Sequence, residues 1–564
     1  MKKKPLWIAL MLAGTSFLAS GCFIVIPGRR TSSSSTKSSS YSSSKEEESY
    51  EISSISSQKI DDDVVVNKTK IRGTYDELLR NDWYGGSDYT PASGSPKLLI
   101  IPIWFTDSSS FITSLNKEKV RSDIEASYLG SEEETGWESV KTYYRKESGG
   151  RLNLQGTVAD WYECGKASTY FASDVYDRRG ELVESGAQRV MALVEEASDA
   201  YFSSHPSENR KDYDSDSNGK LDGVMLIYGA PDYASWGKDE YDNLWAYKHE
   251  NFNAEANLAS PTSGVFFWAS YDFMYGGNAL TRAGSSYAGG DTRFCKVDTH
   301  TYIHEMGHMF GLEDYYDYSG QFDPAGGFSM QDENVGGHDP WSNLALGWSD
   351  PYIPTESCKI TLNPYQSSHD LILLTPAWNA FDCAFDEYLL LELYTPTGLN
   401  EFDVDHHYLN RYPQGPKDAG IRLWHVDARL SQYQQIDGED AFSTEKHTNL
   451  NDGLLGPMCQ NTYYLEDSQT NDYLSLLGED YYEYDLLHLI RNDYELGNRA
   501  PLDEEFLSRA DLFQDGDSFS QGNYRKQFPN GTLLDEGKTL GWEFSVSIEG
   551  EGENAVAEVT CYKV

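Results

Sequence analysis

Basic residues are scarce in this chain of 564 residues. Lysine and arginine together number 45, against 90 aspartates and glutamates, so the formal net charge at pH 7 is −45. A field of that sign repels nucleic acids and anionic lipid head groups. We therefore expect no nucleic-acid partner and a soluble protein outside the cell. A solvated acidic surface explains most of the charge, and some of it would suit calcium ions.

A long apolar run is also missing, because the stretch from Leu6 to Leu18 is too short to span a bilayer comfortably. It follows Lys2 to Lys4, which is typical of an export signal. The stretch ends in Ala-Ser-Gly-Cys22 and resembles a bacterial lipoprotein signal, although Ala19 stands where such signals usually have leucine. Lipidation of Cys22 would hold the protein at the outer face of the cytoplasmic membrane. An ordinary secretory signal is the alternative.

Cysteine is sparse, and no two cysteines have the close spacing of a Cys-x-x-Cys metal site. Motifs for a serine or cysteine nucleophile and a glycine-rich phosphate loop are absent as well. If Cys22 is lipidated, six of the seven cysteines remain. An even number outside the cell permits disulfides, but the pairing stays open. Apart from Cys22, the cysteines are Cys164, Cys295, Cys358, Cys383, Cys459 and Cys561.

What is present indicates a folded chain, because 39% of the residues are hydrophobic and 13% are aromatic. The length favours two or more domains. A tract rich in serine and glutamate, from Thr31 to about Gln58, predicts a flexible tether. We predict a signal peptide (1–22), a disordered tether (23–70), a catalytic domain (71–350) and a β-rich C-terminal region (351–564).

Apolar patterning predicts mixed α and β structure before residue 350. Lys97–Phe105 and Gly223–Tyr228 are continuous apolar runs of strand length, and Leu152–Val158 alternates as a half-buried strand does. Val183–Tyr201 has helical periodicity, and Ser139–Arg145 predicts the end of a helix that two glycines stop.

Strand-like runs dominate beyond Trp348-Ser-Asp350. The four runs are Tyr388–Leu393, Ile421–Val426, Trp542–Ile548 and Ala555–Tyr562. The last two of them resemble a terminal hairpin. The whole pattern predicts an α+β protein.

The segment His304-Glu305-Met-Gly-His308 carries the clearest chemical signal. On a helix, residues four apart share a face, so His304 and His308 can grip one ion. Glu305 lies about 100° around the helix and can reach a water molecule on that ion without being a ligand. A zinc site for hydrolysis needs three protein ligands, an open position for water and a base.

The third ligand follows from the next residues. Gly311 can adopt a left-handed conformation and end the helix, and the turn would bring Asp314 back toward the metal. An alternative geometry takes the third ligand from a glutamate some 20 to 25 residues downstream. Glu333 has that spacing, but two glycines before it favour a turn rather than the required helix. Zinc content after Asp314→Ala or Glu333→Ala distinguishes the two.

The sequence His-Glu-x-x-His-x-x-Gly-x-x-Asp resembles the immune inhibitor A-like bacterial zinc metallopeptidases, which are related to the metzincins. Metzincins have histidine where this chain has Asp314. The resemblance covers roughly residues 95–430 and implies a metzincin-like domain with a mixed sheet and an active-site helix, followed by a mostly β region. Besides the motif, it rests on Ser139–Leu152, Asp214–Tyr228, Gly327–Met330, Trp341–Trp348, Glu387–Glu392 and Gly420–Asp427.

The resemblance implies a metalloendopeptidase that acts on proteins or peptides. His304, His308 and Asp314 would hold zinc, and Glu305 would take a proton from the attacking water and deliver it to the leaving amine. Met330 falls where a Met-turn is expected and would pack beneath the metal; an ordinary core methionine is the alternative. The alternative function is a zinc-containing surface adhesin or binding lipoprotein that does not cleave a substrate. The zinc site of such a protein would not need Glu305.

A second cation site is predicted in the acidic loop before Gly223. The oxygen donors recur at alternate positions, with Gly219 at the sharp turn, as in a calcium-binding loop. The bidentate glutamate of a full EF-hand is missing, and a polar turn is the alternative. The predicted ligands are Asp214, Asp216, Asn218, the carbonyl of Lys220, and Asp222.

The remaining histidines receive no catalytic role. His300 shares the helix face of His304, but the helix rise puts it about 6 Å further along the axis. His406, His407 and His425 lie in the C-terminal part, where His425, near Asp427, predicts a strand residue with a hydrogen-bond partner.

Overall fold

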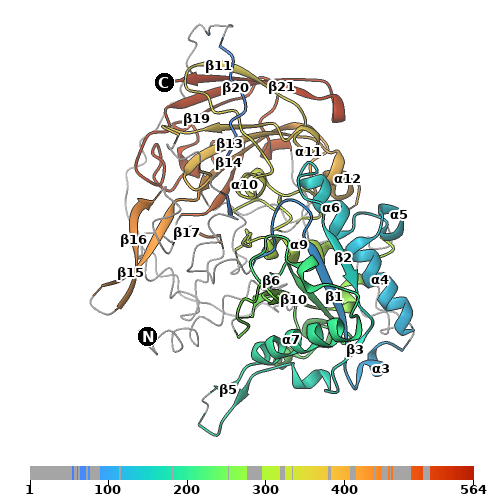
Figure 1. Cartoon of the computed structure of the whole chain (residues 1–564). Helices are drawn as coiled ribbons and strands as arrows, with labels where there is room; N and C mark the ends of the chain where they lie inside the picture. The colour runs from blue at the N-terminus through green and yellow to red at the C-terminus, as the bar shows by residue number, and fades with distance from the viewer. Residues whose placement is uncertain are drawn as a thin grey trace, which may run out of the picture.

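The two apolar runs of the N-terminal part form neighbouring strands of one sheet in the computed structural model (Figure 1). β1, Lys97–Trp104, lies in parallel between β2, Gln155–Val158, and β7, Val224–Tyr228. β10, Val265–Ser270, continues the sheet in parallel, and β8, Tyr247–Glu250, closes that edge antiparallel. Because helices cover both faces, the central strands are apolar at almost every position.

The structure describes most of the chain from residue 64 onward. Among the described residues, no helix is long and apolar enough to cross a membrane. Cys22, the rest of the predicted signal peptide, Glu333 and His407 lie outside the described residues. The described residues are 54–55, 60, 64–71, 74–75, 89–113, 116–179, 182–251, 253–275, 295–317, 324–332, 334–378, 383–406, 414–436, 439–447, 455–457, 459–461, 484–498 and 509–564.

One long helix covers one face of this sheet, and three shorter helices cover the other. α7, Gly186–Ser204, packs Val190, Leu193 and Val194 against one face. The opposite face is covered by α4, Lys117–Leu129, α6, Val140–Glu147, and α9, His300–Met309. The result is a three-layer arrangement in which α9 carries the predicted metal motif.

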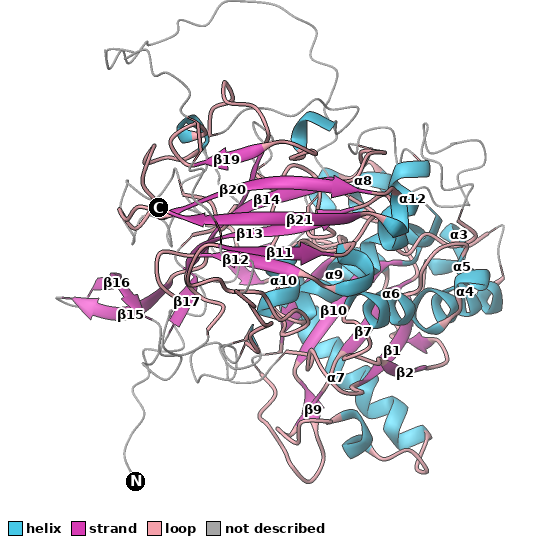
Figure 2. Ribbon diagram, turned by 90° about the horizontal axis from the view of Figure 1, so that it is seen from above, coloured by secondary structure: helices cyan, strands magenta, loops and turns pink. Residues whose placement is uncertain are grey.

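Two antiparallel sheets form a sandwich in the C-terminal part. The outer sheet has the order β11-β21-β20-β19, and the inner sheet has the order β12-β13-β14-β18. The long strands of the two sheets overlap in the view of Figure 2. Their facing side chains, such as Leu389, Leu391, Phe544 and Val559, form one apolar cluster. The strand bounds are β11 Cys358–Leu362, β12 Leu371–Leu374, β13 Glu387–Tyr394, β14 Gly420–Asp427, β18 Leu487–Ile490, β19 Ser518–Ser520, β20 Trp542–Glu549 and β21 Val556–Lys563.

The inner sheet of the sandwich is buried on both faces. Alternate residues of β13 point to the sandwich, while Tyr388, Leu390 and Tyr394 join a core that also contains Trp341 and Met306 from the N-terminal part. A strand covered on both sides has a continuous apolar sequence, as β13 has. The sheets thus separate near residue 350, but the hydrophobic core crosses that position.

The remaining elements are short. A further hairpin, β4–β5, and the small sheet β16-β15-β17 extend from the two layered parts. Their bounds are α3 Ser108–Phe111, α5 Glu132–Thr135, α8 Tyr233–Trp236, α10 Pro340–Ala345, α11 Tyr365–Ser368, α12 Glu401–Asp405, β3 Tyr162–Glu163, β4 Val175–Tyr176, β5 Leu182–Glu184, β6 Lys220–Leu221, β9 Thr262–Ser263, β15 Leu430–Ile436, β16 Glu439–His447 and β17 Leu455–Pro457.

The α+β prediction is confirmed, and most predicted elements are present with shifted ends. The helix predicted from Val183 begins at Gly186, because the Ser185 side chain caps it by accepting from the backbone of Gln188 at 3.0 Å. The predicted terminal hairpin is β20 paired with β21. Lys68, assigned to the tether, forms an ion pair with Asp370 at 2.7 Å, so the end of that segment contacts the folded chain.

The cysteines of the described residues are all free thiols, four of them buried. Cys358 and Cys561 lie directly opposite each other on β11 and β21, the first and last strands of the sandwich. Neither residue could be paired from sequence spacing alone.

Candidate metal centre

Helix α9 is fixed against both the sheet and its neighbouring helix. The Tyr302 hydroxyl donates to the carbonyl of Ser270 at the end of β10, at 2.8 Å. The Tyr144 hydroxyl, from α6, donates to the carbonyl of Ile303 at 2.6 Å. Nearly every residue of the helix is buried, so its histidines point into the protein and not to bulk solvent.

The three predicted zinc ligands meet at one point. The Nε2 atoms of His304 and His308 are 3.1 Å apart, and Asp314 Oδ1 lies 3.0 Å from the first and 3.2 Å from the second. Atoms bound at about 2.0–2.2 Å around one tetrahedral zinc ion are about 3.3–3.6 Å from one another. The three donor atoms therefore need only a small outward movement to hold the ion.

Hydrogen bonds on the far side of each imidazole define which nitrogen faces the site. His304 Nδ1 lies 2.7 Å from the carbonyl of Met330, and His308 Nδ1 lies 2.7 Å from the carbonyl of Leu312. A carbonyl only accepts, so each Nδ1 donates and each neutral ring presents the Nε2 lone pair. Two lone pairs and the carboxylate of Asp314 thus face each other in a buried space. That arrangement is repulsive unless a cation lies among them, so the donor set fits zinc.

The pKa shifts show how strongly this site favours positive charge. Burial alone would raise the pKa of Asp314, but His308 and His304 lower it far below its usual value. Burial would lower the pKa of His308, yet Asp314 raises it to about 9. Without a metal, a proton supplies the positive charge that the three ligands require.

The turn after α9 brings Asp314 into position. Gly311 has a φ of 100°, which is strained for residues with a side chain. The amide of Leu312 donates to the carbonyl of Gly307 at 3.1 Å, which folds the chain back over the helix end. The Leu312 carbonyl then holds His308, and Asp314 follows two residues later. The predicted role of Gly311 thus has a structural basis.

Glu305 lies beside the three ligands with no role in holding the fold. Its side chain is fully buried, and neither carboxylate oxygen has a hydrogen-bond partner among the described residues. Burial, with a smaller contribution from Asp314, raises the pKa of Glu305 to about 8 in the absence of a metal. A buried carboxyl group without protein partners is costly, so it is available to a water molecule or substrate.

The segment around Met330 supports the site through its backbone. Met330 is buried, and its carbonyl accepts from His304, as described above. The carbonyl of Gln331 accepts from the amide of Tyr315 at 2.8 Å, which fixes the chain just after Asp314. The sequence motif could not reveal these carbonyl contacts, because every residue type carries the same carbonyl.

The other histidines do not join the centre. His300 Nε2 lies 2.9 Å from the carbonyl of Asn334, and the ring centroid of His300 is 6.3 Å from that of His304. Glu333, the alternative third ligand, lies outside the described residues. His425 does have a hydrogen-bond partner, but that partner is Glu387 and not the neighbouring Asp427.

The acidic loop is closed by its own side chains. Asp214 accepts from the backbone amides of Asn218 and Gly219, at 2.9 and 3.1 Å. Asp222 accepts from the amide of Lys97 at 2.9 Å, which connects the loop to β1. These bonds order the turn with or without an ion, so calcium binding here stays a prediction.

Comparison with known proteins gives one family for the region that holds the centre. Residues 123–338 match the catalytic domain of immune inhibitor A peptidase M6. The pre-pro-metalloprotease PrtV of Vibrio cholerae serotype O1, in strains M66-2 and ATCC 39315 / El Tor Inaba N16961, is 24% identical over 226 residues. That match covers 36% of this chain and 22% of each relative. The matched family region includes His304, Glu305, His308 and Asp314.

Proposed function

We propose that the protein is a zinc-dependent metalloendopeptidase that hydrolyses peptide bonds of extracellular proteins, because residues 123–338 match the catalytic domain of immune inhibitor A peptidase M6. The observation that carries the proposal is the convergence of His304, His308 and Asp314, with Glu305 buried and unpartnered beside them. A purely structural zinc site would not need a free carboxylate.

The protein's residues divide the chemistry between them. His304, His308 and Asp314 would hold zinc, which would supply Lewis-acid activation of water and of the peptide carbonyl. Glu305 accepts the proton of the attacking water and transfers it to the leaving amine. The carbonyls of Met330 and Leu312 keep both imidazoles in the tautomer that presents Nε2.

Cleavage of unfolded casein by the purified chain tests this proposal. We expect cleavage that a chelator abolishes and that added zinc restores, while added calcium alone does not restore it. Absence of cleavage by the zinc-loaded protein would contradict the proposal and favour the alternative, a zinc-containing surface adhesin or binding lipoprotein.

We also propose that the protein acts at the cell surface through an N-terminal lipid anchor. The support is the apolar stretch from Leu6 to Leu18 that ends at Cys22. Replacing Cys22 with serine should move the protein from the membrane fraction to the medium. The chain has no other predicted contact with a membrane.

Calcium binding by the loop from Asp214 to Asp222 is a further proposal, with a structural role. Its support is the spacing of the oxygen donors and the sharp turn at Gly219, which has a φ of 86°. Calcium should raise the unfolding temperature of the protein, and Asp216→Ala should remove this rise. Equal stabilisation of the wild type and the variant would contradict the site.

A further inference from the structure

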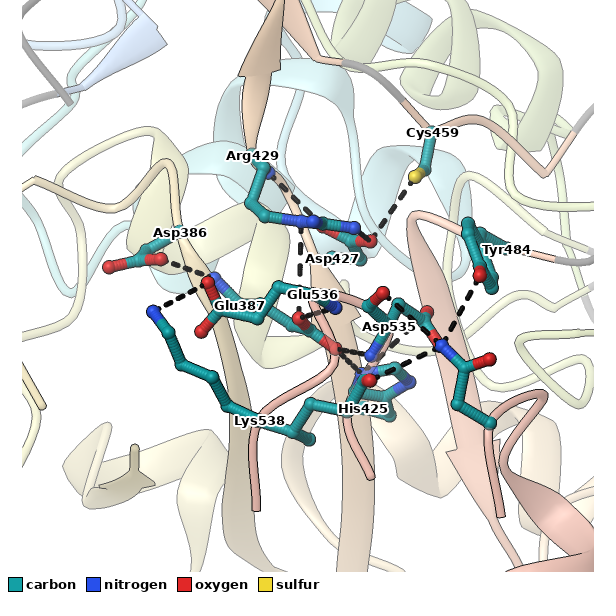
Figure 3. A network of polar contacts seen from close by, with 12 residues as sticks. Asp386, Glu387, His425, Asp427, Arg429, Cys459, Tyr484, Asp535, Glu536 and Lys538 are labelled. Atoms are coloured by element: carbon teal, nitrogen blue, oxygen red, sulfur yellow. Dashed lines mark hydrogen bonds and ion pairs between the residues drawn. The ribbon is translucent and has the colours of Figure 1, made fainter. Parts of the chain in front are cut away.

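A second group of ionisable side chains lies in the C-terminal sandwich, apart from the predicted active site. Glu387, His425 and Asp535 each offer one ligand atom, and these atoms lie within 4.8 Å of one another (Figure 3). His425 Nε2 is 2.9 Å from Glu387 Oε1 and 4.0 Å from Asp535 Oδ2. The three side chains are between 0% and 2% exposed, so the group is closed to bulk solvent.

The pairing of two strands brings the first two residues together. In the register of β13 and β14, Glu387 lies opposite Asp427, and His425 lies opposite Leu389. Residues two apart on a strand share a face, so Glu387, His425 and Asp427 all point to the same side. That side faces the interior of the sandwich, where His425 is also 5.3 Å from the ring of Phe528.

The loop before β20 supplies the third residue. Both oxygens of Glu387 accept from this loop: Oε1 from the amide of Asp535 at 2.5 Å and Oε2 from the amide of Glu536 at 2.8 Å. These bonds fix the loop so that the Asp535 side chain points to His425. Neither carboxylate oxygen of Asp535 has a hydrogen-bond partner among the described residues. A buried carboxylate without hydrogen bonds is costly unless a cation compensates it.

The charged side chains around these three residues include carboxylates that a divalent cation could balance. Arg429 donates from Nε to Asp427 Oδ1 at 2.7 Å and from a terminal nitrogen to Oδ2 at 2.5 Å, so these two charges neutralise each other. Glu387 Oε2 lies 3.9 Å from Arg429 Nε, a longer contact than those of Asp427, so Glu387 and Asp535 are the carboxylates that a cation beside His425 would compensate. One dication would balance the two carboxylates and leave His425 neutral.

We propose that Glu387, His425 and Asp535 bind a structural zinc ion that ties the loop before β20 to strands β13 and β14. One imidazole nitrogen with two carboxylate oxygens suits zinc, whereas calcium prefers oxygen ligands only. The ion would connect two sheets of the sandwich at the end where Glu387 and His425 lie. Since the site is buried and holds no free base, we assign the ion a role in stability and not in catalysis.

Zinc content of the full chain in a Glu305→Gln background, which prevents self-digestion, tests the proposal. After equilibration with zinc and desalting, we expect about two zinc ions per chain in this parent. Asp535→Asn should leave about one, His304→Ala should also leave about one, and the combined variant should hold almost none. Asp370→Asn changes another buried carboxylate of the C-terminal part, paired with Lys68, and should keep the content of the parent.

About one zinc ion in the parent, unchanged by Asp535→Asn, would overturn the proposal. So would two ions in the parent with both retained in Asp535→Asn. If Asp535→Asn fails to fold, the unfolding temperature of the His304→Ala variant decides. A rise on adding zinc, absent in His304→Ala combined with His425→Gln, supports the site, and no rise contradicts it. Loss of casein cleavage plays no part in these readouts, so the proposed peptidase activity stands or fails separately.

Discussion

Among single residues, Asp314 distinguishes the proposed metal centre because it is an anionic third ligand. Asp314 lies within 3.2 Å of both imidazole nitrogens and is 1% exposed. A carboxylate donates more charge to the metal than a third histidine would. A water molecule on the metal would then be less acidified, which would make the buried base Glu305 more important.

The first prediction concerns this ligand. Asp314→Ala should lose the zinc of this centre and casein cleavage, because only two protein ligands would remain there. Glu333→Ala is the matched comparison, since Glu333 is the alternative third ligand. Metal analysis of both purified variants should show about one zinc ion fewer per chain in Asp314→Ala than in Glu333→Ala, and the reverse would contradict the assignment.

The convergence of the three proposed metal ligands could be predicted from sequence because their spacing is local. His304, His308 and Asp314 lie within eleven residues, and helix geometry with one glycine turn brings them together. The carbonyls of Met330 and Leu312 could not be predicted, since a backbone carbonyl has no residue-type signature. The group of Glu387, His425 and Asp535 was also out of reach, because it depends on strand register and on a loop over a hundred residues away.

At the scale of elements, the end of α9 is the part that converts a helix into a metal site. The helix ends at Met309, and Gly311 turns the chain with a φ of 100°. The start of α7 was predicted less well, because a capping side chain determines where this helix begins. The Ser185 cap delays α7, and the sequence pattern of apolar residues does not contain that information.

The second prediction concerns this turn. Gly311→Ala forces a side chain into a positive-φ conformation, which should lower the free energy of unfolding by about 1–2 kcal/mol. It should also weaken zinc binding, because Asp314 moves with the turn. Gly516→Ala is the matched control, since Gly516 has a φ of 87° in a turn of the C-terminal sandwich with no atom within 4 Å of an added Cβ. Urea unfolding and zinc titration of both variants check this. Equal zinc affinity in the two would contradict the role of Gly311.

At the scale of the whole molecule, the sandwich and the catalytic part are joined by a buried arginine. Arg422, on β14, forms an ion pair with Glu392 at 2.8 Å and donates to the carbonyl of Phe328 at 3.3 Å. Its guanidinium also lies 5.0 Å from the ring of Phe328. Phe328 belongs to the same segment as Met330, whose carbonyl orients His304. The C-terminal sandwich thus supports the metal centre through the backbone.

The third prediction concerns this connection. Arg422→Ala leaves Glu392 buried without its partner, which should lower the free energy of unfolding by about 3–5 kcal/mol. Zinc affinity should fall as well, because the segment of Phe328 loses a contact. Lys359→Ala removes an exposed ion pair with Glu558 and should change stability little. Unchanged zinc affinity in Arg422→Ala would show that the sandwich and the centre are independent.

The sequence predicted strands on both sides of residue 350 but not how they stack. A buried run such as β13 has the same pattern whether its second face meets another sheet or another domain. Only the structure shows that Tyr388 and Leu390 share a core with α9, while Leu389 and Leu391 face the sandwich. The predicted boundary at residue 350 therefore separates sheets that remain joined by one core.

The most direct test of the central claim is the Glu305→Gln variant, compared with the wild type at equal zinc content. We predict that the variant retains the zinc of the three ligands, because Glu305 is not one of them, and that its rate of casein cleavage falls by about 10²- to 10⁴-fold. A zinc-loaded variant that cleaves casein at the wild-type rate would contradict the account.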